Sequence, residues 1–280
     1  MTAGARRIRW AALTAAAVSA SPWPAASQDR LDRDQVLAIL ARASAEHPAD
    51  FSGKDLAGLD LSGVDFKRAN LAKCRLVRTN FRNAQLFSVT LTDADASEAD
   101  FTAANLDVAV AYRIGLRGAV LRDASAFATI LEGADLSDAD LSGFRFLGPM
   151  ANIKAPRAKF VKANLGVDPG NQSMGLMNTL MANAKATGAD FSNSDFSRAN
   201  FSFADLSGAR MQRTQLMRAD LSGATLAGAD LTEANLQDAQ IIDTDFSKAN
   251  LTGADFTGAT FRGVRGLESA ITTGARGLPR

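Results

Sequence analysis

Few side chains in this sequence are of the kinds that carry out covalent chemistry. The chain of 280 residues has one histidine, His47, and one cysteine, Cys74. A catalytic cysteine and histidine must lie within hydrogen-bond reach, but His47 stands beside Pro48 at the end of a predicted helix, well away from Cys74. The single cysteine excludes an intramolecular disulfide, and histidine and cysteine are too scarce for a zinc site.

The carboxylates are abundant, but their positions are regular. Fifteen of the 30 acidic residues are aspartates that directly precede a position recurring every five residues, which is most often Leu or Phe, so no two of them stand out as an acid and base pair. Met174, Met177 and Met181 lie close together, and their thioethers could bind Cu(I) or simply fill an irregular core. There is no phosphate-binding glycine loop and no zinc-protease motif. We therefore expect no enzyme and no cofactor, with a copper site as an alternative.

The charge balance also limits the partners of the chain. Lys and Arg total 31 against 30 acidic residues, and the segment before Gln28 holds three arginines and no acid. Without that segment the net charge is −2, from 28 basic and 30 acidic residues. A nucleic-acid-binding protein normally carries a basic surplus, so this class is not expected.

The amino terminus predicts export. Three arginines precede an apolar run from Trp10 to Ala20, and small residues end the stretch at Ser27. This order is typical of a secretory signal peptide, residues 1–27, cleaved before Gln28. The apolar run is about half of the ~20 residues that a membrane-spanning helix needs. We expect a periplasmic or extracellular protein with no stable membrane insertion.

A short amphipathic helix is predicted between Leu31 and Ser44, with Asp32 or Asp34 as its N-cap. Residues 28–48 would then form a capping helix and linker at the start of the next domain.

A period of five residues governs the rest of the chain. From Phe51 to Phe146 there are twenty such positions, here called centres, and seventeen are Phe or Leu. From Phe191 to Phe261 there are fifteen centres, of which thirteen are Phe or Leu. In that second block, Ala stands two residues before twelve centres, and Asp or Asn stands one residue before ten.

Neither a helix nor a flat strand can bury all of these centres on one side. Five residues of an α-helix advance by about 500°, so successive centres drift around it, and an odd period alternates the faces of a strand. A chain that bends inward once per repeat can collect every centre on one axis by winding into a solenoid. Asp or Asn before the centre suits such a bend because its side chain can bond nearby backbone groups.

The repeats resemble the pentapeptide-repeat family, whose pattern is A(D/N)LXX. The resemblance covers most of residues 49–265 and includes Ala69-Asn70-Leu71, Ala134-Asp135-Leu136, Ala199-Asn200-Phe201, Ala219-Asp220-Leu221 and Ala254-Asp255-Phe256. It implies an all-β fold, a right-handed quadrilateral β-helix with four pentapeptides per coil. The short N-terminal α-helix and a C-terminal tail, residues 266–280, would cap the two ends of this solenoid.

The rhythm breaks once. Two solenoid blocks, residues 49–147 and 181–265, flank an interruption over residues 148–180, within which Phe160 and Leu165 come one residue early. Solenoids place insertions on their surface, so we expect either a projecting loop or a hinge here.

Departures from the repeat on its outer positions are candidate partner contacts. Apolar or aromatic residues follow the centre where Ser or Thr is usual at Phe87, Tyr112, Phe127 and Leu147. With four repeats per coil, Phe87, Phe127 and Leu147 stack in one column with Asp107. The interruption adds a basic group, Lys154, Arg157, Lys159 and Lys162. Partner contacts and ordinary surface residues are both open interpretations. The centres Ala96, Ala111 and Ala126 lie in the same coils and predict a thinner core.

The sequence therefore favours an exported, non-enzymatic scaffold or protein-binding surface, with no nucleic-acid partner. Two alternatives remain. Some members of the family mimic duplex DNA and bind type II topoisomerases, which would require a cytoplasmic location and a contiguous acidic face. The other is a metal or small-ligand binder that uses the methionine-rich interruption.

Overall fold

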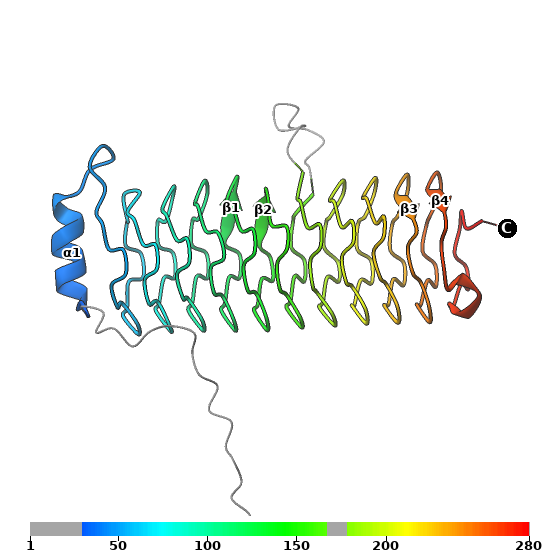
Figure 1. Cartoon of the computed structure of the whole chain (residues 1–280), viewed down its shortest axis with the longest axis horizontal. Helices are drawn as coiled ribbons and strands as arrows, with labels where there is room; N and C mark the ends of the chain where they lie inside the picture. The colour runs from blue at the N-terminus through cyan, green and yellow to red at the C-terminus, as the bar shows by residue number, and fades with distance from the viewer. Residues whose placement is uncertain (1–29, 167–177, 280) are drawn as a thin grey trace, which may run out of the picture.

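The chain winds into a rod of stacked coils (Figure 1). The computed structural model describes residues 30–166 and 178–279, so the predicted signal peptide, residues 1–27, lies outside the described residues. Parallel bridges join the residue before one centre to the residue 20 positions later, as from Asp50 to Asn70. Each coil therefore holds four pentapeptides, and the predicted all-β solenoid is confirmed.

We number the four faces of the rod by their first centres, Phe51, Leu56, Leu61 and Phe66. The residue two before each centre is called the slot, and the two residues after the centre form the corner that follows that face. All described centres from Phe51 to Phe256 are buried, and most slots are buried with them. The residue before the centre and the two corner residues face outward, so the interior is almost entirely apolar.

The repeat from Asp220 to Ala224 shows how the backbone is satisfied. The N–H groups of Leu221 and Gly223 donate to the next coil, to the carbonyls of Gln240 (2.9 Å) and Ile242 (2.7 Å). Asp220 N–H donates to the previous coil at Ala199 (3.0 Å), and Ala224 N–H closes the turn onto Leu221 (3.0 Å). The fifth N–H, that of Ser222, donates to Oδ1 of Asp220 (2.9 Å). The Asp before the centre thus supplies the acceptor that the coils do not.

The second corner residue must adopt a left-handed conformation, which explains the frequent glycine there. Gly223 has φ of 68°. Glycine reaches this region without a Cβ penalty, whereas other residues reach it at a cost. Many corners nonetheless hold larger residues, such as Arg213 with φ of 55°. The stacked hydrogen bonds of the coils hold these corners in place.

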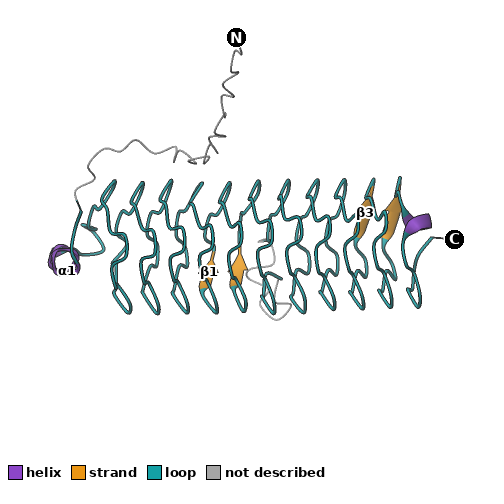
Figure 2. Ribbon diagram, turned by 90° about the horizontal axis from the view of Figure 1, so that it is seen from below, coloured by secondary structure: helices purple, strands orange, loops and turns teal. Residues whose placement is uncertain are grey.

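Four short strands stand out from the bridges. β1 (Ser125–Phe127) pairs in parallel with β2 (Arg145–Leu147), and β3 (Gln240–Ile242) pairs in parallel with β4 (Thr260–Arg262). β1 and β2 belong to the fourth face and β3 and β4 to the first, so the two pairs lie on different sides of the rod (Figure 2).

Helix α1 (Arg33–Arg42) lies across the first coil. Its N-cap is Asp32, and the buried Val36 and Leu40 join the core of the rod. The first coil has carbonyl groups with no preceding coil to bond, and three of them accept hydrogen bonds from residues 30–33. The side chain of Arg30 donates to the carbonyl of Ala57 (3.2 Å). Leu31 N–H donates to Asp55 (3.1 Å), and the side chain of Arg33 donates to the carbonyl of Asp60 (2.8 Å). None of the helices in residues 30–166 and 178–279 has the length and apolar character to span a membrane.

At the other end, the winding continues beyond residue 265. A short 3₁₀ helix, η2 (Leu267–Ser269), is followed by bridges from Asn250 to Ile271 and from Asp255 to Arg276. The expected tail of residues 266–280 therefore adds two more faces to the last coil.

In the structure, the irregular part of the segment 148–180 is shorter than the sequence predicts, because residues 149–165 form stacked repeats. Asp140 bridges to Lys159, one position sooner than the usual spacing, so one residue is missing after Phe146. Beyond the insertion, bridges such as Pro149 to Leu180 resume the stacking, so the insertion lengthens its coil without interrupting the rod. Residues 149–165 form regular repeats, and the described coils on both sides remain hydrogen-bonded, which does not fit a hinge.

Hydroxyl groups that enter the core bond to the backbone of the preceding coil. Thr214 fills a slot, and its Oγ1 donates to the carbonyl of Phe191 (2.9 Å). The same bond is made from the slots of Cys74, Thr79, Thr129 and Thr244. In the described part of the chain, no buried side-chain nitrogen or oxygen lacks a partner.

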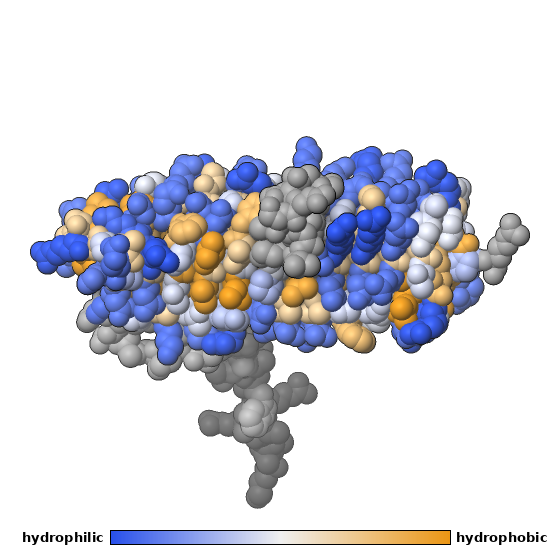
Figure 3. Space-filling model, turned by 90° about the horizontal axis from the view of Figure 1, so that it is seen from above, coloured by the Kyte–Doolittle hydropathy of each residue, from blue (hydrophilic) through white to orange (hydrophobic). Residues whose placement is uncertain are grey.

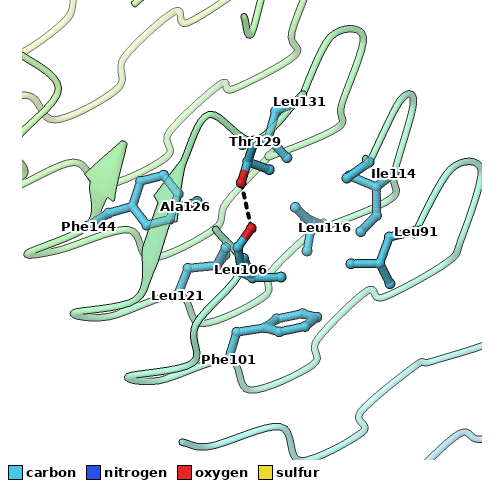
Figure 4. A pocket seen from close by; sticks show the side chains of 11 residues that line it. Leu91, Phe101, Leu106, Ile114, Leu116, Leu121, Ala126, Thr129, Leu131 and Phe144 are labelled. Atoms are coloured by element: carbon cyan, nitrogen blue, oxygen red, sulfur yellow. Dashed lines mark hydrogen bonds between the residues drawn. The ribbon is translucent and has the colours of Figure 1, made fainter. Parts of the chain in front are cut away.

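The thinner core that the sequence predicts around Ala111 and Ala126 is present only as a small cavity. Both alanines line an apolar cavity of about 10 Å³, shown in Figure 4, which is about the space of one water molecule. The lining also includes Ile114 and Phe144, which occupy slots where the repeat normally has Ala. Large slot residues therefore replace most of the volume that the small centres leave out.

This compensation predicts a coupled effect on stability. Phe144→Ala should lower the free energy of unfolding by about 3–5 kcal/mol because it enlarges the cavity. Ala126→Leu should cost about 1–3 kcal/mol because Phe144 already occupies the space. Urea denaturation of the double variant should show a loss smaller than the sum of the two, by roughly 0.5–3 kcal/mol. If the loss in the double variant equals the sum of the two single losses, Phe144 does not fill the space that Ala126 leaves, and the interpretation is wrong.

Candidate partner-binding surface

The single cysteine lies in the interior of the rod and the single histidine lies on its surface. Cys74 is buried, its Sγ donates to the carbonyl of Phe51 (2.9 Å), and burial raises the pKa of its thiol to about 12. His47 is exposed at the far end of the α1 segment. Met181 is a buried centre, and Met174 and Met177 lie outside the described residues. In residues 30–166 and 178–279, no three His, Cys, Asp or Glu side chains are placed to hold a metal ion.

The exterior carries ion pairs that run from coil to coil. Arg113 and Asp93 occupy the same corner position in successive coils and meet at 2.7 Å, and Arg122 meets Asp140 at 2.6 Å. Similar cross-coil pairs involve Arg75, Arg78, Arg82, Arg117, Arg157, Arg210, Arg213, Arg218 and Arg276. Exposed pairs of this kind contribute little each, about 0–1 kcal/mol. Their main effect is to leave the surface close to neutral along its length.

The most strongly bonded outward carboxylate is Asp255. Its Oδ1 accepts from Thr257 Oγ1 (2.6 Å) and N–H (3.0 Å), and its Oδ2 accepts from Gln237 and Arg276, both at 2.8 Å. The Thr257 hydroxyl and N–H, with help from Gln237 and Arg276, lower the pKa of Asp255 from 3.8 to about 2.

This pKa shift predicts acid sensitivity. A lowered pKa in the folded state means that Asp255 stabilises the fold above about pH 4 and loses this contribution as the pH falls toward 2. Denaturation curves at several pH values should show a shallower loss of stability between pH 4 and 2 in Asp255→Asn than in the wild type. Equal slopes in both proteins would contradict the role given to this carboxylate.

Apolar side chains gather at the fourth corner. Phe87 and Phe127 are the first residues of this corner in their coils and are 48% and 40% exposed. Val108, the second corner residue of the coil between them, is 45% exposed. We call these three residues the apolar column. Asp107 stands between the two phenylalanines, but its Oδ1 accepts from Ser125 Oγ (2.6 Å) and Phe127 N–H (2.8 Å).

Leu147 does not belong to the exposed column, contrary to the expectation from its spacing. It pairs with Phe127 in the β1–β2 register, but it is only 3% exposed. The repeat after Phe146 lacks the left-handed corner residue, so Leu147 is followed directly by the buried Gly148 of the next slot. The shortened corner draws Leu147 inward.

The other candidate contacts are spread over the rod. Tyr112 lies at the first corner and is half-buried. Lys154 precedes a centre of the second face and Lys159 precedes a centre of the third, so both are exposed on different sides. Arg157 pairs with Asp138 at 2.6 Å. Lys162 is at the third corner, so the four basic residues follow one coil around two faces and do not form one patch.

Figure 3 shows one side of the rod. Patches of apolar surface, in orange, lie on it among mostly hydrophilic neighbours. The last described residue before the insertion, Gly166, occupies the same corner position as Phe87 and Phe127.

Val108 and Arg145, which lie at the two edges of the fourth face, are not predicted as contacts from the sequence. Val108 is a second corner residue, a position whose residue type varies so much along the repeats that a valine there does not stand out. Arg145 stands before a centre and is exposed between Ser125 and Asn164. Stacking the sequence at a period of 20, corrected to 19 after Phe146, would have placed both beside the residues named above.

Comparisons with known proteins agree with this architecture. A family model described as "Pentapeptide repeats" matches the chain in eight copies, over residues 49–83, 116–143, 176–213, 214–253 and 229–265. No curated protein sequence matches the chain.

Solved structures with similar coils include HetL, a pentapeptide repeat protein from the cyanobacterium Nostoc sp. strain PCC 7120 that is involved in heterocyst differentiation regulation. It is 27% identical, with a TM-score of 0.43 over 88% of this chain and 94% of its own. QnrB1, a plasmid-mediated fluoroquinolone resistance protein, is 18% identical, with a TM-score of 0.46 over 68% of this chain and 89% of its own. A thylakoid-lumen protein of Arabidopsis thaliana is 30% identical, with a TM-score of 0.34 over 38% of this chain and 67% of its own.

Proposed function

Because the chain belongs to the pentapeptide-repeat family, we propose that it acts as a rigid, non-enzymatic scaffold whose outer surface binds a protein partner. The apolar column of Phe87, Val108 and Phe127 is the observation that carries this proposal. Exposed apolar groups that are contiguous and rimmed by polar residues are typical of protein-binding sites. The column lies on a stiff support, because every coil beneath it is hydrogen-bonded to both neighbours.

The described exterior gives no support to a DNA mimic. Such a protein would need a contiguous acidic face, whereas here arginines and carboxylates alternate from coil to coil in the pairs described above. Other surface aromatics, such as Phe203 at 68% exposed, stand apart from the column and pack over Gly223. The fourth corner therefore remains the best candidate for the contact.

The proposal includes export and two finer features of the fold. Residues 1–27 have the order of a secretory signal peptide, which supports a periplasmic or extracellular location. N-terminal sequencing of protein from native cells should begin at Gln28, and an intact Met1 would refute cleavage. We also propose that the coil is right-handed, as in the family, and that α1 is the N-terminal cap that protects the first coil from edge-to-edge pairing. An experimental structure would check the handedness.

Crosslinking in native cells tests the binding surface. A photo-reactive phenylalanine analogue in place of Val108 should crosslink to a defined partner that mass spectrometry identifies. The crosslinked product should fall about tenfold when Phe87→Ser and Phe127→Ser are added, since each removes much of a buried aromatic contact of roughly 1.5–3 kcal/mol.

The matched control places the same analogue at Phe203, which is more exposed than Val108 but lies at the first corner, away from the apolar column. No partner from the Val108 position, or the same products from both positions, would contradict the proposed surface.

A further inference from the structure

A groove of about 550 Å³ runs along the third corner, on the other edge of the face that carries β1 and β2. Three successive coils line it, with Arg122 and Asp123 from the first, Gly143 and Arg145 from the second, and Lys162 and Asn164 from the third. Unlike the small cavity of Figure 4, which is enclosed by core residues, this groove lies on the outside of the rod.

Gly143 forms the floor of this groove. The corner residues stacked with it are Asp123 in the coil before and Lys162 in the coil after. A Cβ built on Gly143 would overlap the carboxylate of Asp123, so the absence of a side chain at Gly143 leaves room for that carboxylate to lie against the floor. The lining of the groove therefore combines a small residue at its floor with charged side chains, one of them the Asp123 carboxylate.

Most charged side chains in the groove are basic, and two of them have no acidic partner among the described residues. Arg122 is held by Asp140, with Nη2 to Oδ2 at 2.6 Å. In the described part of the chain, Arg145 and Lys162 make no side-chain hydrogen bond and no ion pair, unlike the eleven cross-coil arginines above. The amide of Asn164 adds a further donor, and Asp123 is the single carboxylate in the lining. A planar guanidinium next to an ammonium group suits a carboxylate ligand.

The groove and the apolar column share one face. Arg145 pairs with Ser125, and two residues further along the same strands Leu147 pairs with Phe127. Alternate residues of a strand point to the same side, so the guanidinium of Arg145 and the ring of Phe127 both project from this face. They are separated by about two residues of strand, roughly 7 Å along it, and one strand spacing of about 4.8 Å across.

From this arrangement we propose that the face binds an extended peptide segment of the partner in which a carboxylate residue is followed, two positions away, by a large apolar side chain. The carboxylate lies between Arg145 and Lys162, and the apolar side chain packs on Phe127 and Val108. Two positions of an extended peptide span about 6.6 Å, which equals two residues of strand on the face, and the step of about 4.8 Å across to the neighbouring strand lies within the reach of the side chains. The inference rests on the proposed function and specifies the chemistry of its partner.

The test is an NMR titration of the ¹⁵N-labelled protein with a capped model peptide, Gly-Ser-Asp-Gly-Leu-Ser-Gly. The amide signals of Arg145, Asn164 and Phe127 should shift with a saturable curve, and added salt should weaken binding because exposed charges are screened. Arg145→Gln with Lys162→Gln should weaken binding by about fivefold to tenfold, the effect of losing two exposed ion pairs. Peptides with Asn for Asp, or Ser for Leu, should also bind more weakly.

The matched control is Lys248→Gln with Arg262→Gln. It removes the same charge from exposed residues that, among those described, have no ion pair. Unchanged peptide binding in this control supports a defined site, whereas an equal loss in both double variants would overturn it as general attraction. Equal binding of the Ser-for-Leu peptide, or full displacement by inorganic phosphate, would show a simple anion site and overturn the peptide proposal. An absence of shifts would do the same.

The two proposals fail in different ways. If Val108 crosslinks to a partner and Arg145→Gln with Lys162→Gln leaves that crosslinking unchanged, the groove is not used, although the scaffold function stands. If the Val108 position yields no partner in cells, the proposed function fails, whatever the model peptide does. Loss of the crosslink in the groove variant, but not in the Lys248→Gln, Arg262→Gln control, supports both.

Discussion

The whole rod depends on finding an acceptor for every backbone N–H of a five-residue repeat. Three of the five donate to neighbouring coils and one closes the turn, as the repeat from Asp220 to Ala224 shows. The remaining N–H has no backbone partner, and the side chain of Asp220 supplies it. Where Asp or Asn precedes the centre, this bond satisfies the N–H at the corner and holds the polar side chain outward, while the next residue points to the axis. The alanine slots, apolar centres and left-handed corners follow from that orientation.

Much of this architecture could be predicted from the sequence, because each physical rule acts within one or two repeats. The recurrence of Leu and Phe at an odd period predicts the solenoid, and the Asp or Asn before each centre predicts the side-chain bond to the turn. The thin core was also anticipated, although its size was not, since Ile114 and Phe144 fill most of the space left by Ala111 and Ala126.

What could not be predicted depends on contacts between coils. Spacing placed Leu147 in the exposed column, but the missing corner residue after Phe146 buries it. The same missing residue changes the stacking from 20 to 19, so the third-corner groove joins residues whose numbers give no sign of proximity. The sequence shows Lys162 as part of a basic run, whereas in the structure it lines the groove with Arg122 and Arg145 from earlier coils. In both cases the neighbours of a residue are set by the register between stacked coils, which cannot be read from a single sequence.

The bridges on both sides of the insertion have a practical implication. Pro149 pairs with Leu180 and Asn164 with Asp195, so the described coils before and after the insertion stack directly on each other with the same register as elsewhere. The entropy cost of a longer loop rises only slowly with length. The junction between Gly166 and Asn178 is thus a natural acceptor for grafted sequence, and the rod could display a foreign epitope or enzyme there without losing its periodic order.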